Sequence, residues 1–224
     1  EFEALKEVGS SSDFLLAKPL YSFPWCIVTT YIPGTPLNEA VATKSDDRTI
    51  KKVVETIAVF HEKNANESSS RHNLGDIYLK ATGKKLTTDT QKFVIDSKVG
   101  SYHGDLDPFN ILLVNEGSEF ALIDWEDYRT DGMQELDILH FISMLSLIEN
   151  PGISYTELYD VTFSNTDNQY YELLKIYCKE RKISLANVLK FIPVYCDAQN
   201  LRLEEAGRDT DNFLYNDFKK KYYV

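Results

Sequence analysis

The chain has 224 residues, of which 43% are hydrophobic, and a formal net charge of −11. This length and composition can bury a sizeable core as one domain, with at most a small appendage. The acidic balance argues against nucleic acid and anionic membranes as partners, and no apolar run approaches the roughly 18 residues that a membrane helix needs.

Three cysteines, Cys26, Cys178 and Cys196, show no short paired spacing. An odd number of thiols argues against a disulfide framework. No signal-peptide pattern is present, so we expect a reducing compartment and a cytoplasmic location.

The first 34 residues combine a short helix with strands. Apolar residues at positions 2, 5 and 8 predict a helical face over Glu1–Val8. Phe14–Leu20 and Trp25–Ile32 are rich in apolar, β-branched and aromatic side chains, which predicts two strands of a small sheet. Pro33-Gly34-Thr35-Pro36 breaks this pattern, so we predict a hinge between residues 1–34 and a second unit, residues 35–224.

Helices dominate beyond the hinge. The first runs from Asp46 or Asp47 to about Asn64, and its His61 is better explained as a packed structural histidine than as a catalytic one. Shorter helices are expected over 76–83 and 89–99. Residues 135–150 are apolar nearly all round, which predicts a buried helix. Further helices are expected over 155–162, 168–181 and 185–206, the last broken near Ile192 by Pro193.

Residues 103–126 hold the densest group of chemically capable side chains. The segment HGDLDPFN (103–110) precedes an apolar strand, a turn at 115–118 and a second apolar strand that ends in Asp124-Trp125-Glu126. An antiparallel hairpin brings its two ends together, so Asp105, Asn110 and Asp124 are expected to converge. Two carboxylates and a carboxamide suit Mg²⁺ and a hydroxyl that must lose its proton; an ordinary acidic turn is the alternative.

HGDLDPFN followed by IDWE resembles the catalytic loop and metal-binding segment of the aminoglycoside phosphotransferase and choline kinase-like family. The segments AVFHEKN, YIPGTPL and EDYRTDGMQELDILHF support this resemblance, which covers residues 1–145. It implies an α+β, protein-kinase-like fold: mainly the helical C-terminal lobe with a catalytic β-hairpin, plus a remnant of the small β lobe.

The same resemblance implies phosphorylation of a small-molecule hydroxyl, with ATP or GTP and Mg²⁺ as cofactors. Asp105 would be the catalytic base, and Asn110 and Asp124 would hold the metal ion. Glu126 would add a metal or water contact, with ordering of the loop as the alternative.

Supporting roles follow from the resemblance as well. His103 would orient the loop, Asp137 would satisfy its backbone groups, and Asp107 is better explained as a turn former than as a second base. The backbone of the hinge segment would hydrogen-bond an adenine edge, and a core strand without a ligand is the alternative. That segment consists of Thr29, Thr30, Tyr31 and Ile32.

The substrate stays open among aminoglycosides, choline or ethanolamine, and sugars, and so does the oligomeric state. Aromatic and acidic side chains of the tail helices are candidates for the substrate wall, although helix surface is the simpler interpretation of each. Such a mixture would hold an amine, which favours amino-sugars or amino-alcohols. The candidates are Tyr195, Asp197, Asn200, Glu204 and Glu205.

One departure from the family is important. Its glycine-rich strand-turn-strand and its strand lysine precede the first helix, and this sequence contains neither. The sequence is therefore expected to be either a fragment or a reduced module that binds a ligand without transferring phosphate. A catalytically silent, kinase-like binding or scaffold domain is thus the rival function, and metal-dependent phosphoester hydrolysis ranks last.

Overall fold

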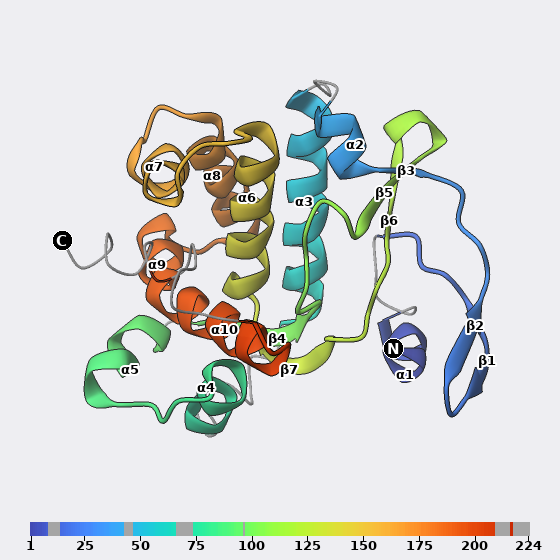
Figure 1. Cartoon of the computed structure of the whole chain (residues 1–224), viewed down its shortest axis with the longest axis horizontal. Coiled ribbons are helices and arrows are strands. Elements are labelled where there is room, and N and C mark those ends of the chain that lie inside the picture. Colours follow the sequence, from blue (N-terminus) through green and yellow to red (C-terminus); the bar gives the residue numbers. More distant parts are fainter. Residues whose placement is uncertain (9–13, 43–46, 66–73, 96, 209–215, 217–224) are drawn as a thin grey trace.

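Helices form most of the described chain, and small antiparallel sheets accompany them, one of which lies at the right-hand edge of the view (Figure 1). The computed structural model describes residues 1–8, 14–42, 47–65, 74–95, 97–208 and 216. The helices are α1 (Phe2–Val8), α2 (Leu37–Ala42), α3 (Asp47–Lys63), α4 (Leu74–Thr82), α5 (Thr88–Val94), α6 (Glu135–Glu149), α7 (Tyr155–Tyr159), α8 (Gln169–Arg181), α9 (Leu185–Lys190) and α10 (Ile192–Glu205). The strands are β1 (Pro19–Phe23), β2 (Cys26–Thr29), β3 (Thr35–Pro36), β4 (Val99–Tyr102), β5 (Ile111–Val114), β6 (Glu119–Leu122) and β7 (Arg129–Met133).

The helical core is built around α3, α6 and α8. α3 buries Ile50, Val53, Val54, Ile57 and Ala58, which are spaced along one helical face. α3 packs along α8, and α8 also contacts α6. α6 is buried nearly all round, so the predicted helices after Asp47 and after Gln134 are both confirmed.

The predicted hairpin is present as β5 and β6. Ile111 lies opposite Leu122, and the short 3₁₀ turn Asn115–Gly117 connects the two strands. β3 pairs with the other edge of β5, where Thr35 lies opposite Leu113. Part of the predicted hinge segment is therefore a strand of the hairpin sheet.

The strand predicted over Phe14–Leu20 is wrong, because β1 runs from Pro19 to Phe23. Phe23 lies opposite Cys26, so Pro24 and Trp25 form a two-residue turn. The residues that pair with β2 are therefore those directly before the turn, from Phe23 back to Pro19. Leu15 instead makes an isolated bridge with Ala121 of the hairpin. β2 is the central part of the strand predicted over Trp25–Ile32.

The sheet of β4 and β7 is not evident from the sequence. The helix predicted over 89–99 ends at Val94, and the polar segment after Glu126 contains β7. Gly100 lies opposite Gly132, and a Cβ at Gly132 would stand 1.9 Å from the Tyr102 ring. Because this sheet depends on close contacts at glycines, its strands lack the alternation that marks a strand.

The tail is helical, as expected, but in shorter pieces. The helix predicted over 185–206 is two helices, and Pro193 stands in the first turn of α10, where its missing N–H leaves no hydrogen bond unmade. The predicted break near Ile192 is confirmed. α7 ends at Tyr159 and continues as a π-helical turn, Asp160–Ser164. Within the described part of the chain, no helix is long and apolar enough to cross a membrane.

Candidate active site

The HGDLDPFN segment forms a tight loop between β4 and β5. Asn110 donates from Nδ2 to the main-chain oxygen of Asp105 at 2.9 Å and to Asp105 Oδ2 at 3.3 Å. Asp107 Oδ1 accepts from the N–H groups of Phe109 and Asn110, at 2.8 and 3.1 Å, which is the geometry of an Asx turn. Both Asn110 contacts use the amide nitrogen, so the amide oxygen is left to ligate a cation.

A buried carboxylate holds the backbone of this loop. Asp137, in the first turn of α6, accepts from the N–H of His103 at 2.7 Å and from the N–H of Gly104 at 3.0 Å. His61 Nε2 lies 3.1 Å from Asp137 Oδ2. Burial opposes ionisation of Asp137, but the contacts with His61 and the His103 N–H outweigh it and lower its pKa. The loop is therefore fixed to the core by a charged, fully enclosed acceptor.

His103 connects the loop to the segment that carries Asp124. Its Nε2 lies 2.9 Å from the main-chain oxygen of Ile123, and the Ile123 N–H donates to the main-chain oxygen of Asn110 at 3.0 Å. Asp124 follows directly, with an exposed side chain and a left-handed backbone, φ +62°. Such strain in a residue other than glycine is typical of functional sites. Glu126, two residues on, is also exposed.

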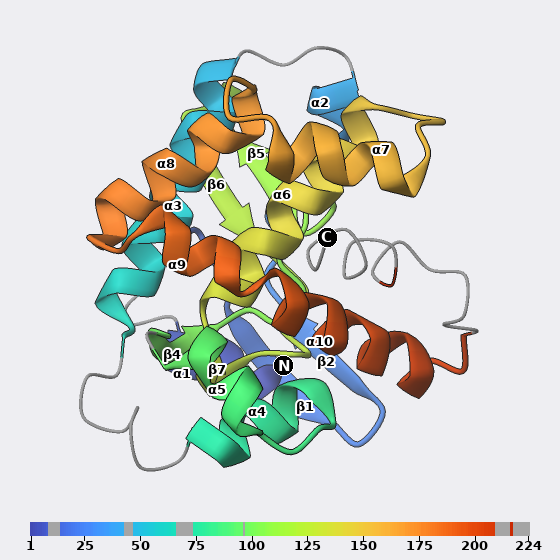
Figure 2. The same cartoon turned by 90° about the vertical axis from the view of Figure 1, so that its left-hand side faces the viewer.

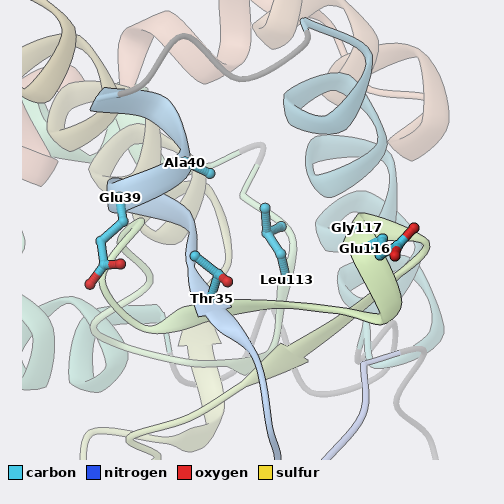
Figure 3. Close-up of a pocket in the computed structure, with 6 residues that line it drawn as sticks. All are labelled: Thr35, Glu39, Ala40, Leu113, Glu116 and Gly117. Carbon is cyan, nitrogen blue, oxygen red and sulfur yellow. The ribbon is translucent and has the colours of Figure 1, made fainter.

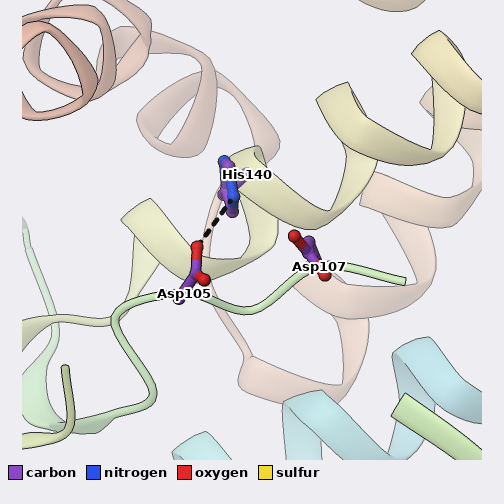
Figure 4. Close-up of side chains that lie close together, drawn as sticks. All are labelled: Asp105, Asp107 and His140. Atoms are coloured by element: carbon purple, nitrogen blue, oxygen red, sulfur yellow. Dashed lines mark ion pairs between the residues drawn. The ribbon is translucent and has the colours of Figure 1, made fainter. Parts of the chain in front are cut away.

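Two side chains that the sequence patterns did not indicate lie against Asp105. Arg202, on α10, donates from Nη1 to Asp105 Oδ1 at 2.7 Å and from Nη2 to Asp127 Oδ2 at 2.8 Å. His140, on α6, places Nε2 at 3.4 Å from the same Asp105 oxygen (Figure 4). Arg202 is 97 residues from Asp105, so no local pattern indicates it. The signal available for His140 was a histidine within a mainly apolar helix.

These neighbours keep Asp105 ionised. Burial alone would raise the pKa of Asp105, but His140 and Arg202 outweigh burial and hold that pKa well below its usual range. Burial, together with the nearby charge of Asp105, raises the pKa of Asp107. Asp105 is therefore a carboxylate near neutral pH, as an acceptor of a hydrogen bond from a hydroxyl must be.

The oxygen ligands at this site fit a hard cation. Asn110 offers an amide oxygen and Asp124 an exposed carboxylate, and oxygen donors are what Mg²⁺ prefers. Asp105, Asp107 and His140 also place three potential ligand atoms within 4.8 Å of one another (Figure 4). The Arg202 guanidinium, however, contacts Asp105 Oδ1 at 2.7 Å, and its positive charge opposes the binding of a cation at Asp105. Asn110 and Asp124 therefore stay the predicted metal ligands.

The hinge residues are partly occupied by protein hydrogen bonds. The N–H of Thr30 donates to the Lys18 main-chain oxygen at 2.9 Å, and Thr30 Oγ1 accepts from the Lys18 N–H at 2.8 Å. Thr29 belongs to β2, and Tyr31 is exposed. Among the backbone groups of the four predicted residues, the Thr30 N–H is therefore already used within the protein.

The candidate substrate wall is corrected by the structure at two positions. Tyr195 is fully buried and its hydroxyl lies 3.2 Å from His140 Nδ1, so it supports the site from inside the core. Asp197 is buried as well and pairs with Lys84 at 2.6 Å. α10 points Arg202, rather than these residues, at Asp105.

A wide, open hollow of about 480 Å³ lies at the turn end of the hairpin (Figure 3). Thr35 and Glu39 stand on one side of it and Glu116 on the other. None of the predicted site residues lines this hollow, so it is separate from the chemistry described above.

No protein-family model and no curated protein matches the chain. Solved structures do match it. The ADP-bound aminoglycoside phosphotransferase APH(2'')-Ib aligns with a TM-score of 0.56 and 13% identity, over 98% of this chain and 79% of the other. An ethanolamine kinase from Plasmodium vivax aligns with a TM-score of 0.55 and 12% identity, over 99% and 69%. The GDP and kanamycin complex of a second APH(2'') protein aligns with a TM-score of 0.55 and 13% identity, over 100% of this chain and 78% of the other. The predicted fold is therefore confirmed: the chain has the α+β, protein-kinase-like fold of these small-molecule kinases, mainly a helical lobe that carries the β5–β6 hairpin.

Proposed function

We propose that this protein transfers the terminal phosphoryl group of ATP or GTP to a hydroxyl group of a small molecule. The observation that carries the proposal is the pairing of Asp105 with Asn110, in which an ionised carboxylate lies beside an amide whose oxygen is left for a cation. Phosphoryl transfer needs positioning and charge neutralisation above all, and this pair contributes to both. The kinases of the same fold are consistent with the proposal.

In this mechanism Asp105 orients the acceptor hydroxyl. Arg202 and His140 both contact Oδ1, so Oδ2, with its longer contact to Asn110, is the oxygen that receives the hydroxyl proton as the new O–P bond forms. Asn110 Oδ1 and the Asp124 carboxylate would hold Mg²⁺, with Glu126 as a further water or metal contact. A bound Mg²⁺ neutralises phosphate charge.

The hinge would receive the nucleotide base through backbone groups of Thr29, Thr30, Tyr31 and Ile32 other than the Thr30 N–H, which already donates to Lys18. Residues 1–34 would then act as a remnant of the small lobe, and residues 35–224 as the catalytic and substrate lobe. The β1–β2 hairpin forms a sheet of its own, which is consistent with this division, while Leu15 joins residues 1–34 to β6 through two main-chain hydrogen bonds.

The test compares Asp105→Asn with wild type. The full chain is incubated with Mg²⁺·ATP and glucose, glucosamine or ethanolamine, and the phosphorylated acceptor is detected by mass spectrometry. Loss of a positioned base is expected to lower turnover by about 10²–10⁴-fold, while ADP affinity measured by calorimetry stays within about twofold. The matched control is Asp167→Asn, on an exposed loop, which is expected to match wild type. Equal turnover in Asp105→Asn and wild type would refute the assignment of the base.

One contact favours a second candidate function. Arg202 occupies Asp105 Oδ1 at 2.7 Å, as it would in a kinase-like module that binds a nucleotide without transferring phosphate. That function predicts Mg²⁺·ADP binding in calorimetry, no phosphorylated product from any acceptor, and no effect of Asp105→Asn on binding.

A further inference from the structure

The buried neighbour of the candidate base connects it to the core. His140 lies on α6 and is 6% exposed, and its Nε2 stands 3.4 Å from Asp105 Oδ1 (Figure 4). Its other ring nitrogen, Nδ1, lies 3.2 Å from the hydroxyl of Tyr195, which is fully buried on α10. α10 packs against α6 (Figure 2). Three side chains therefore form one chain of polar contacts, Asp105–His140–Tyr195, which ends inside the protein.

The charge on Asp105 decides which nitrogen of His140 carries the proton. An ionised carboxylate only accepts hydrogen bonds, so a lone pair on Nε2 would face a second acceptor. With the proton on Nε2, the ring donates to Asp105 Oδ1, and Nδ1 is left as an acceptor for the Tyr195 hydroxyl. Each contact in the chain then joins a donor to an acceptor.

α6 holds the loop at two points one helical turn apart. Asp137 and His140 are three residues apart, so they lie on the same face of the helix. Asp137 accepts from the N–H groups of His103 and Gly104, which fixes the backbone of the loop. His140 contacts the side chain of Asp105, so two residues of one helix hold the backbone and the side chain of the loop.

Burial distinguishes the contact with His140 from the contact with Arg202. Arg202 also reaches Asp105 Oδ1, but its side chain is 33% exposed and is shared with Asp127. Water competes for an exposed ion pair, whereas a contact enclosed in the protein is retained. His140 is thus the more persistent donor to Oδ1, which leaves Oδ2 turned towards Asn110.

We propose that His140 is a positioning residue for the base, and that Tyr195 holds His140 in place. Through its Nε2–H, His140 fixes the carboxylate of Asp105 so that Oδ1 is occupied and Oδ2 faces the acceptor hydroxyl. The hydroxyl proton still passes to Oδ2, so His140 neither gains nor loses a proton in the step. The word base rests on the proposed function; the hydrogen bond from His140 to Asp105 does not.

Two substitutions separate the N–H donor of His140 from the bulk of its ring. The amide of His140→Gln carries an N–H near the position of Nε2, whereas that of His140→Asn lies nearer Nδ1 and Tyr195. The full chain is assayed with Mg²⁺·ATP and whichever of glucose, glucosamine and ethanolamine it phosphorylates. We expect His140→Asn to lower kcat about 10–10²-fold and His140→Gln to stay within about fivefold of wild type, with KM for ATP unchanged in both.

The hydroxyl of Tyr195 is tested in the same assay. Tyr195→Phe is expected to lower kcat severalfold, because His140 loses the contact that holds its ring. The matched control is Tyr170→Phe, which removes a buried hydroxyl bonded to Glu149 at the other end of α6. It is expected to lower the melting temperature and leave kcat unchanged. Thermal melts check that each variant is folded.

A second measurement does not depend on turnover. Proton–nitrogen NMR of the imidazole rings at pH 8 reports whether Nε2 of His140 carries a proton. The chain has four histidines, and the signal missing from His140→Gln identifies this one. A protonated Nε2 is expected in wild type, and its resonance should move in Asp105→Asn.

The outcomes separate this inference from the proposed function. An unprotonated Nε2, or equal kcat in His140→Asn and His140→Gln, would overturn the role of His140 and leave the kinase proposal intact. A protonated Nε2 that responds to Asp105→Asn, without phosphoryl transfer to any acceptor, would support the hydrogen bond and contradict the kinase proposal. If His140→Asn does not fold, Tyr195→Phe and the NMR measurement decide.

Discussion

Replacing Asp137 with asparagine is expected to cost about 2–4 kcal/mol of unfolding free energy, because this carboxylate fixes the catalytic loop. Asp137 is 1% exposed. Its Oδ1 accepts from the Gly104 N–H, and its Oδ2 accepts from the His103 N–H and contacts His61 Nε2.

The magnitude follows from how many of these contacts an amide can keep. An asparagine retains one acceptor oxygen, so either the Gly104 N–H or both the His103 N–H and His61 lose their partner. The less damaging orientation removes one hydrogen bond to a charged group, about 1.5–3 kcal/mol, and leaves the partly buried Gly104 N–H unpaired. The remaining bonds lose the benefit of the charge. For a domain of this size, the melting temperature should fall by roughly 2–4 °C per kcal/mol.

Urea denaturation followed by tryptophan fluorescence measures the loss. Trp125 packs against His103 with ring centroids 4.7 Å apart, so its emission reports on the loop. Asp167→Asn, which removes an exposed carboxylate, is the matched control and is expected to stay within about 0.5 kcal/mol of wild type. If Asp137→Asn is no less stable than Asp167→Asn, the hydrogen bonds to Asp137 do not hold the loop, and the reasoning is refuted.

Three further predictions follow from packing, burial and exposure. A Cβ at Gly132 would stand 1.9 Å from the Tyr102 ring, so Gly132→Ala should lower the unfolding free energy, measured by urea titration, by about 1–3 kcal/mol. The control is Gly75→Ala in α4, where a Cβ would meet nothing within 4 Å; it should leave the unfolding free energy unchanged or raise it by up to roughly 1 kcal/mol. Burial lowers the pKa of His61 from 6.5, so as the pH falls below that value the unfolded chain binds a proton that the folded protein does not. The unfolding free energy of wild type should therefore fall from pH 7 to pH 5, and that of His61→Gln should fall less. The same dependence of unfolding free energy on pH in both proteins would contradict this. Cys26 is exposed and the other two cysteines are buried, so a thiol reagent should label one thiol in the native protein and three in urea; rapid native labelling of more than one would contradict the burial.

The helices, the β5–β6 hairpin and the segment with Asp105 and Asn110 were predictable because the signals that specify them are local. Apolar spacing marked α3 and α6, and Pro193 marked the break before α10. The loop contacts between Asp105 and Asn110 span five residues. At such separations, the backbone geometry that a short motif adopts is enough to bring its side chains together.

Only the tertiary structure decided which distant groups surround Asp105. Arg202 and His140 reach it from α10 and α6. The β4–β7 sheet likewise depends on contacts at glycines rather than on a strand pattern. Periodicity in a sequence records which face of an element is buried, whereas the neighbour of that face is chosen by the packing of the whole chain. For that reason the sequence by itself determined the loop that carries the candidate chemistry, and the packing of α6 and α10 decided which charged side chains surround Asp105.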